Sequence, residues 1–215
     1  MNPWRYLAAK GDVEEIPFEI VGPMFSEMFQ LFKALHPQIS ESLMQEIHDR
    51  CRPVRFKKKS LILDYGETCG HVFFAARGLV RAIFQREGME QTCWFMGEGD
   101  IVIAVESFYS QQPSLERLVA MEDTDCIALS WDDLQVIYEK HVDFNIIGRK
   151  LTELYYRQAI ERTKWVCLSA KERYDALFKD YPKFLNRVPD VALASYLGIG
   201  KSYLSKIRTD VHFQK

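Results

Sequence analysis

Residues 190–210, DVALASYLGIGKSYLSKIRTD, hold the most specific pattern in the chain. Apolar residues at helical spacing flank one glycine; they are Leu193, Leu197, Ile199, Leu204 and Ile207. Gly198 fits a tight turn between two helices, because glycine adopts the left-handed conformation without a Cβ penalty. Ala194 is small enough for the second helix to cross close over the first. The stretch therefore predicts a helix-turn-helix.

The outward face of the second predicted helix is polar and basic. Its residues are Lys201, Ser202, Tyr203, Ser205, Lys206 and Arg208. Lysine and arginine contact guanine edges or phosphates, and serine and tyrosine hydroxyls donate to phosphate oxygens. This face predicts binding to double-stranded DNA. The alternative is a plain helical hairpin with a solvated basic face.

Charge is divided unevenly along the 215 residues. Residues 145–215 hold 14 Lys and Arg against 7 Asp and Glu, whereas the first 144 residues hold 14 against 23. A basic C-terminal third on an acidic body indicates that the C-terminal part meets a polyanion.

Residues 52–130 consist of short β-rich runs separated by glycines. Turn signals recur about every 10 residues, a spacing typical of an all-β sandwich or roll. Within this region, residues 86–89 predict a hairpin tip between two strands.

Helices are predicted on both sides of the β-rich region. Apolar spacing predicts one over 24–35, ended by Pro37, and another after Ser40. A third begins after the cap Ser130. These segments and the roll form the first predicted domain, residues 1–142.

A long helix is predicted over residues 143–168, about 37 Å at 1.5 Å per residue. A helix of this length typically bridges domains or pairs with its own copy, and an ordinary core helix is the alternative. The residues expected in a dimer seam are Phe144, Ile147, Leu151, Tyr155 and Ala159. Ser169 and Glu172 form a capping-box pattern that starts a third unit, residues 169–215, with short helices expected over 170–180 and 182–188.

Together these parts resemble the Crp/Fnr family of bacterial transcription regulators, named for the cyclic AMP receptor protein. LILDYGETCGHVFFAARGLVRAIF, residues 61–84, is similar to the family's roll segment, and MGEGDIVI to the turn entering its nucleotide cassette. The resemblance implies an α+β fold: an N-terminal double-stranded β-helix (jelly-roll) sensor domain, a long connecting dimerisation helix and a C-terminal all-α helix-turn-helix domain. It also implies a homodimer that places two recognition helices in successive major grooves of a near-palindromic operator.

Three departures from the family pattern qualify that resemblance. Lys201, Ser202 and Lys206 stand where the family has an Arg-Glu pair and a later Arg, so we expect a different operator sequence. Glu116 stands where the cassette arginine neutralises a cyclic phosphate. Only TDVHFQK follows the recognition helix, so a wingless DNA-binding unit is expected.

The cassette departure predicts a roll that does not bind cyclic AMP. A carboxylate beside the phosphate would repel it, and Arg117, one residue further along a strand, points to the opposite face. Glu106, Ser107 and Arg117 are candidates for a pocket that takes another effector. The alternative is a cassette loop with solvated polar residues.

Other classes of protein have little support in the sequence. No apolar run approaches the length of a membrane span and no signal peptide is recognisable, so a cytoplasmic protein without membrane contact is expected. The five cysteines lack metal-ligand spacing, and the five histidines are isolated from any nucleophile or carboxylate pair. We therefore expect no metal, no cofactor and no catalysis.

The sequence thus predicts a homodimeric, sequence-specific transcription regulator. The alternative is a ligand-sensing or protein-interaction module whose helix-turn-helix only packs, which leaves the basic C-terminal third unexplained. RNA polymerase and an unknown small-molecule effector are open as further partners.

Overall fold

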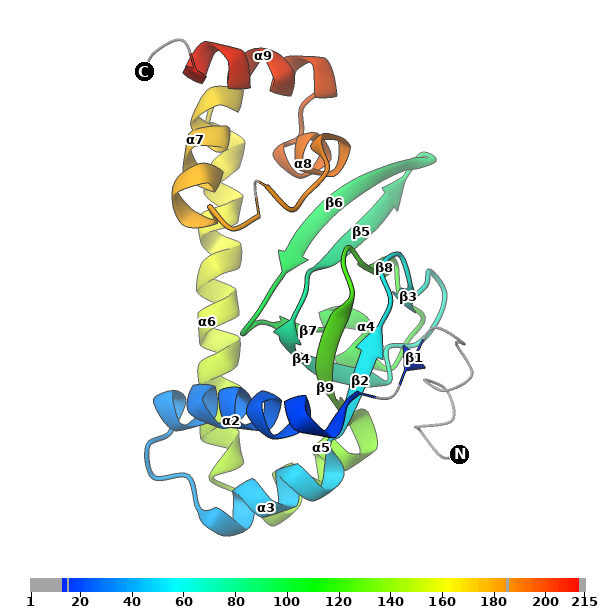
Figure 1. The fold of residues 1–215 in the computed structure, drawn as a ribbon, viewed down its shortest axis with the longest axis vertical. Coiled ribbons are helices and arrows are strands. Elements are labelled where there is room, and N and C mark those ends of the chain that lie inside the picture. Colours follow the sequence, from blue (N-terminus) through cyan, green and yellow to red (C-terminus); the bar gives the residue numbers. More distant parts are fainter. Residues whose placement is uncertain (1–12, 15, 185, 213–215) are drawn as a thin grey trace.

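The computed structural model describes residues 13–14, 16–184 and 186–212. Its strands form two antiparallel sheets, ordered β1-β2-β9-β4-β7 and β3-β8-β5-β6, which face each other as a roll (Figure 1). The strands are β1 (Val13–Glu14), β2 (Arg52–Phe56), β3 (Leu61–Leu63), β4 (His71–Arg77), β5 (Val80–Arg86), β6 (Met89–Met96), β7 (Ile101–Val102), β8 (Glu116–Ala120) and β9 (Thr124–Ser130). The predicted roll over 52–130 is confirmed.

Local sequence explains the long hairpin of the second sheet. Arg86 pairs with Met89, and the two residues between them have positive φ, 53° at Glu87 and 78° at Gly88. Two consecutive positive φ angles are those of a type I′ turn, whose twist matches that of the strands. The hairpin tip is where the sequence predicts it.

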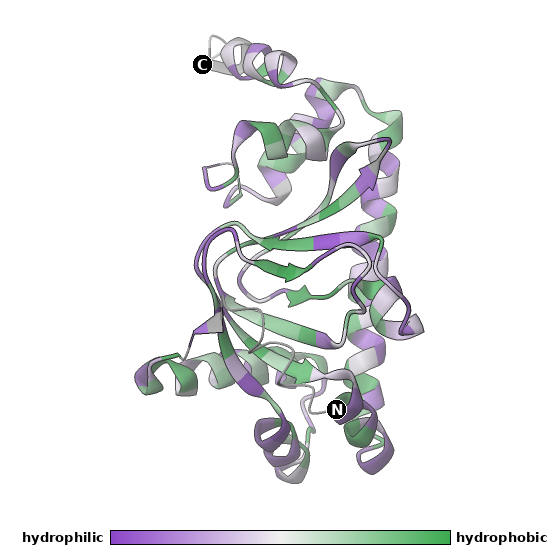
Figure 2. Cartoon of the chain, turned by 90° about the vertical axis from the view of Figure 1, so that its right-hand side faces the viewer, coloured by the Kyte–Doolittle hydropathy of each residue, from purple (hydrophilic) through white to green (hydrophobic). Residues whose placement is uncertain are grey.

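Burial follows the position of each strand in the roll. Every residue of β9 is buried, because the strand lies between β2 and β4 inside its sheet. Figure 2 shows hydrophobic residues concentrated on the strands, whereas the helices alternate hydrophobic and hydrophilic residues. Side chains such as Leu118 and Phe108, both without exposed area, belong to the hydrophobic core of the roll and its helices.

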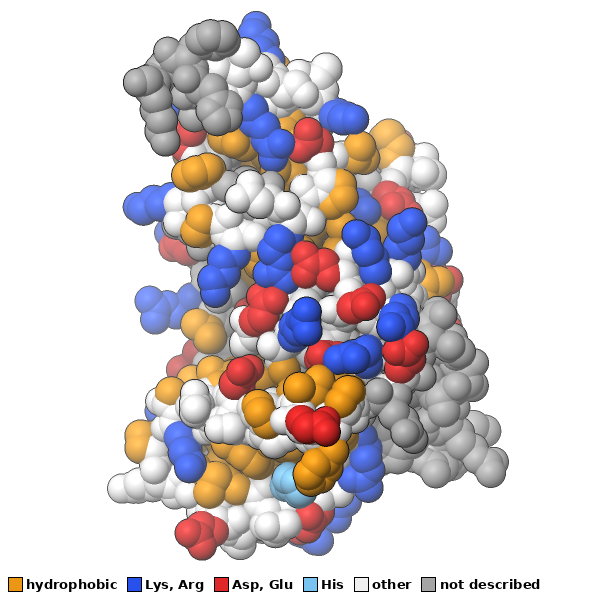
Figure 3. Space-filling view, viewed as in Figure 1, with side chains coloured by type: hydrophobic (Ala, Val, Ile, Leu, Met, Phe, Trp, Pro, Cys, Tyr) orange, Lys and Arg blue, Asp and Glu red, His pale blue; other side chains and the backbone are white. Residues whose placement is uncertain are grey.

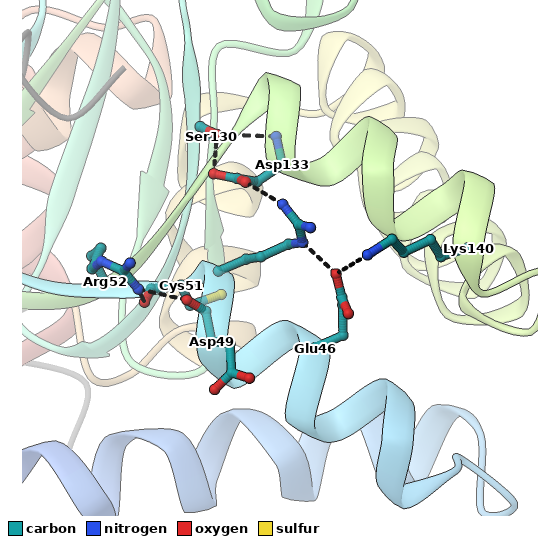
Figure 4. A network of polar contacts seen from close by, with 8 residues as sticks. Glu46, Asp49, Cys51, Arg52, Ser130, Asp133 and Lys140 are labelled. Atoms are coloured by element: carbon teal, nitrogen blue, oxygen red, sulfur yellow. Dashed lines mark hydrogen bonds and ion pairs between the residues drawn. The ribbon is translucent and has the colours of Figure 1, made fainter. Parts of the chain in front are cut away.

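Three helices cover one end of the roll: α2 (Phe18–Leu35), α3 (Glu41–Arg50) and α5 (Trp131–Lys140). Ser40 and Ser130 cap α3 and α5 as predicted, each accepting a backbone N–H bond. Arg50 then joins the two helices, since its guanidinium lies 2.6 Å from Glu46 Oε1 and 2.7 Å from Asp133 Oδ1; Figure 4 shows this network with Lys140 bound to the same Glu46.

Helix α6 (Phe144–Lys164) runs along the length of the molecule and continues into the 3₁₀ turn η1 (Trp165–Cys167) (Figure 1). Its 21 residues span about 32 Å at 1.5 Å per residue. Helix α7 (Ala170–Asp180) then begins at the complete capping box of Ser169 and Glu172. The long helix and its end near residue 168 are confirmed.

The helix expected over 182–188 is wrong. This segment forms single turns, with hydrogen bonds such as Arg187 N–H to the Phe184 carbonyl at 3.1 Å. Pro182 and Pro189 leave too few residues between them for two helical turns. Phe184 and Val188 are instead buried against neighbouring elements.

The C-terminal unit contains the predicted helix-turn-helix, α8 (Asp190–Leu197) and α9 (Lys201–His212). Gly198 has φ of 66° between them, as the turn requires. Leu193, Leu197 and Leu204 are buried at 0%, 1% and 0% exposure, so the inward positions are those the spacing predicts. Their cluster also contains Leu79 and Phe95 of the roll, so the roll and the C-terminal unit share a core.

Candidate nucleic-acid interface

Helix α9 lies at one end of the molecule, opposite α2 and α3 (Figure 1). Its exposed residues include five of the six predicted for DNA binding: Lys201, Ser202, Tyr203, Ser205 and Lys206. Leu204 and Ile207 hold the opposite side of the helix in the core. In Figure 3 this end shows Lys and Arg with few acidic side chains, whereas the centre of the same face mixes both signs.

Arg208, the sixth predicted residue, has a different environment. Its Nη1 lies 2.5 Å from Asp190 Oδ1, at the start of α8, and its side chain is only 29% exposed. The guanidinium therefore joins the two helices of the motif. It is not displayed freely beside Lys201 and Lys206.

The effector pocket expected from Glu106, Ser107 and Arg117 is not formed as predicted. Ser107, on helix α4 (Val105–Ser110), is buried, and its Oγ accepts from the Cys69 N–H at 2.9 Å and donates to the Gln112 carbonyl at 2.5 Å. Its hydroxyl is used to fix the loop around α4. Helix α4 itself was not anticipated from the sequence.

Arg117 is held on another surface of the roll. Its Nε donates to Asp64 Oδ1 at 2.7 Å, and its guanidinium lies 4.5 Å above the centre of the Tyr65 ring. Glu106 is exposed. Burial and the negative charge of Glu106 both raise the pKa of Glu116. The cassette region thus presents the carboxyl groups of Glu106 and Glu116. Arg117, the residue after Glu116, is bound to Asp64 instead.

A small half-open cavity lies between the sheets. It is lined by Ile62, Leu63, Cys69, Gly70, His71, Phe73 and Leu118, and none of the three predicted pocket residues is among them. Burial lowers the pKa of His71 to about 4, so the imidazole is neutral near pH 7. The lining of this cavity therefore supplies no positive charge to a phosphate.

Two further observations concern metal binding and membrane crossing. Within the described part of the chain, no three His, Cys, Asp or Glu side chains come together in a way that would hold a metal ion. A membrane-crossing helix is likewise not found among the described residues.

The predicted dimer seam is wrong for Phe144 and Ile147, and Leu151 and Tyr155 are partly buried against their own chain. Phe144 and Ile147 are buried at 5% and 0% exposure in the core of their own chain. Leu151 packs on that core, and the Tyr155 hydroxyl accepts from the Ile101 N–H at 2.7 Å. Of the five residues only Ala159 is exposed. The spacing correctly marks a buried face, but helices of the same chain pack against its start: the Phe144 ring lies 6.2 Å from that of Phe32 on α2 and 5.2 Å from that of Tyr138 on α5.

Comparisons with known proteins show which proteins share this fold. The profile of the cyclic nucleotide-binding domain matches residues 53–141. Similar solved structures include a Crp/Fnr-family regulator from Eubacterium rectale, with 14% identity, TM-score 0.65 and coverage of 84% of this chain and 87% of that one. The chain has the fold of a Crp/Fnr transcription regulator.

Two other structures share this Crp/Fnr fold. FixK2 from Bradyrhizobium japonicum is 18% identical with a TM-score of 0.65, over 76% of this chain and 85% of its own. The c-di-GMP-responsive regulator CLP from Xanthomonas campestris is 14% identical with a TM-score of 0.64, over 81% and 93%. No curated protein sequence gives a significant match.

The wing of the Crp/Fnr pattern is the remaining departure. Helix α9 extends to His212, and residues 213–215 lie outside the described residues, so the wingless unit stays a prediction. Sequence reasoning also missed the residues by which the roll contacts α8, among them Thr92 and Ser195. A serine within the otherwise apolar run of α8 is the signal that could have indicated such a contact.

Proposed function

We propose that the chain is a cytoplasmic, homodimeric, sequence-specific DNA-binding transcription regulator. The observation that carries this proposal is the exposed face of α9, which displays two lysines and three hydroxyl groups while Leu204 and Ile207 are buried beneath it. Amines and hydroxyls on the exposed face of a second helix are the groups that contact base edges and phosphates in the major groove. The Crp/Fnr fold supports the same assignment.

A second copy of the chain would pair along the outer side of α6. Exposed residues there recur at steps of four and three; they form the outer stripe, Arg149, Glu153, Tyr156, Ile160 and Thr163. This 3.5-residue repeat is that of helices that pack side by side. Tyr156 and Ile160 keep 67% and 43% of their area exposed, and Arg149 pairs with Glu153 on the same stripe.

Cyclic AMP is not the effector in this proposal. The cassette offers the carboxylates of Glu106 and Glu116, and Arg117 is bound to Asp64. A cyclic phosphate entering there would face these like charges, which opposes binding. The effector, if the regulator has one, belongs to another chemical class.

The test is selection of bound duplexes from a random DNA pool, with and without a metabolite extract, followed by titration of the winning operator. Lys206→Ala should weaken operator binding by about 1–3 kcal/mol and reduce the preference over a scrambled duplex. Lys33→Ala, an exposed lysine on α2 at the opposite end of the molecule, is the matched control. Equal binding of the Lys206→Ala variant and wild type to both duplexes would favour the alternative, a module whose helix-turn-helix only packs.

A further inference from the structure

Strand β6 and helix α8 are joined by hydrogen bonds between the roll and the helix-turn-helix. The Thr92 N–H donates to Ser195 Oγ at 2.8 Å, and that hydroxyl donates to the Glu90 carbonyl at 3.2 Å. Gln91 Nε2 donates to the Ser195 carbonyl, and Thr92 Oγ1 donates to the Ala192 carbonyl at 3.2 Å. Residues 90–92 with their bonds to α8 are called the hairpin clamp below.

Thr92 is fixed from the roll side as well. Its Oγ1 accepts from Arg81 Nε at 2.9 Å, across the hairpin on β5. Thr92 is 1% exposed, so water does not compete for these bonds. The clamp is therefore a rigid extension of the roll rather than a loose contact between two surfaces.

An ion-paired arginine makes a second attachment beside the clamp. Arg187, in the turns before α8, lies 2.8 Å from Glu98 Oε1 and 2.7 Å from Glu122 Oε2 of the roll. Burial raises the pKa of Glu98, but hydrogen bonds from Arg187 and the Gly78 N–H outweigh it and hold the pKa at about 2. The carboxylate remains charged, so this attachment persists over the physiological range of pH.

Aromatic packing completes the junction. The ring of Phe95, on β6, lies 5.1 Å from that of Tyr196 on α8, and Tyr196 lies 5.9 Å from Trp165 at the end of the long helix. The guanidinium of Arg162, on α6, lies 4.1 Å above the Tyr196 ring and 4.4 Å above the Trp165 ring. Roll, long helix and α8 therefore meet around one tyrosine.

Helix α9 must follow α8 in any movement. The Gly198 turn is closed by the Ile199 N–H bonded to the Ala194 carbonyl at 3.0 Å, and Arg208 is paired with Asp190 across the two helices. From these contacts we infer that the hairpin clamp is the positioning element that sets the angle of α9 relative to α6. The inference rests on the proposed DNA-binding function.

The consequence concerns operator spacing. A dimer with fixed α9 angles fits two half-sites at one separation, and each added base pair turns one half-site by about 35° around the duplex. A dimer whose α9 can swing tolerates the change. Spacing tolerance is therefore a readout that a merely structural role of the clamp would not move.

The experiment compares wild type with a triple variant, Gln91→Ala, Ser195→Ala and Arg187→Gln, on the selected operator and on the same operator lengthened by two base pairs. We expect the preference for the shorter operator to fall by about 10-fold, while binding to a single half-site stays within about twofold. Gln85→Ala, at an exposed glutamine of the same hairpin, is the matched control and should keep the wild-type preference. If the triple variant loses its cooperative melting transition, Ser195→Ala alone carries the comparison.

Hydrogen exchange tests the clamp without DNA. In Ser195→Ala the Thr92 amide loses its acceptor and should exchange at least about 10-fold faster than in wild type. Unchanged exchange of Thr92, or an unchanged spacing preference in the variants, would overturn the inference. If wild type binds no duplex while the Thr92 amide stays protected, the proposed function fails and the clamp is left as a packing contact only.

Discussion

Asp190 and Arg208 form an ion pair of 2.5 Å that joins the first residue of α8 to the C-terminal half of α9. The pair neutralises the one arginine that the sequence places on the face predicted to bind DNA. Lys201 and Lys206 are therefore the exposed basic residues on the face of α9 predicted to bind DNA, while Arg208 links the two helices of the motif.

Asp190→Asn should release that arginine toward phosphate. We expect the plot of log affinity against log salt to steepen by about 0.9 for one extra phosphate contact, with stability changed by no more than about 1 kcal/mol because the pair is partly exposed. Duplex titrations at several salt concentrations measure the slope. Arg208→Ala should leave the wild-type slope unchanged; a flatter slope in that variant would mean that Arg208 already binds phosphate.

Cyclic AMP and cyclic GMP should not stabilise the protein at about 1 mM. A ligand present at 100 times its Kd raises the free energy of unfolding by about 2.7 kcal/mol, which moves the melting temperature of a chain of this size by several degrees. Thermal unfolding with each nucleotide checks this, beside a cyclic AMP-binding regulator as positive control. A reproducible, saturable rise in melting temperature would show that Glu106 and Glu116 do not exclude the cyclic phosphate.

Ile160→Asp should convert dimers into monomers, because it places a charge in the outer stripe of α6, the surface proposed to pack against the second copy. We expect the dimer Kd to rise about 100-fold or more, measured by light scattering over a range of protein concentrations. Leu154→Asp is the matched control: Leu154 is 41% exposed against 43% for Ile160, but lies about 120° around the helix. Dimers that survive Ile160→Asp and dissociate with Leu154→Asp would move the interface to the other face.

Features set by neighbours in the chain could be predicted from the sequence. The caps at Ser130 and Ser169 and the turn at Gly198 each depend on residues within four positions, and each is where the sequence places it. The roll and the helix-turn-helix followed from such signals and from apolar spacing. Their order along the chain then indicated the Crp/Fnr fold.

Features set by distant residues could not be predicted in this way. Arg117 is turned by Asp64, 53 positions away, and Ser107 by the Cys69 amide, 38 positions away, so the expected pocket does not form. Apolar spacing showed that Ile147 is buried but carries no information on whether its own chain or a second copy covers it. The exposure of Lys201, Ser202, Tyr203, Ser205 and Lys206 on α9 was predictable, because the exposed positions of the helix are those that the buried apolar positions leave over.

His71 should make stability fall in mild acid. Burial holds its pKa at about 4 in the folded protein, below the ordinary 6.5. Between these two pH values the imidazole is therefore protonated in the unfolded chain and neutral in the folded chain. The stabilising contribution is complete above pH 6.5 and is lost as the pH falls toward 4, by up to about 3 kcal/mol. Urea unfolding of wild type and His71→Gln at pH 7.5 and 4.5 measures it. The free energy of unfolding of wild type minus that of the variant should fall by about 2–3 kcal/mol from pH 7.5 to pH 4.5, and a constant difference would contradict the prediction.

Gly198→Val should disrupt the helix-turn-helix more than any substitution on its surface. The φ of 66° at this turn lies in the left-handed region, which a β-branched residue enters only with strain of about 1–2 kcal/mol or more, whereas an added Cβ would meet no closer atom than Arg173 Nη1 at 3.5 Å. The cost is therefore conformational and not a clash. Gly198→Asn is the matched control, because asparagine tolerates this conformation. We expect Gly198→Val to lower the melting temperature and abolish operator binding while Gly198→Asn keeps both near wild type. Equal behaviour of the two variants would mean that the turn does not need a left-handed residue.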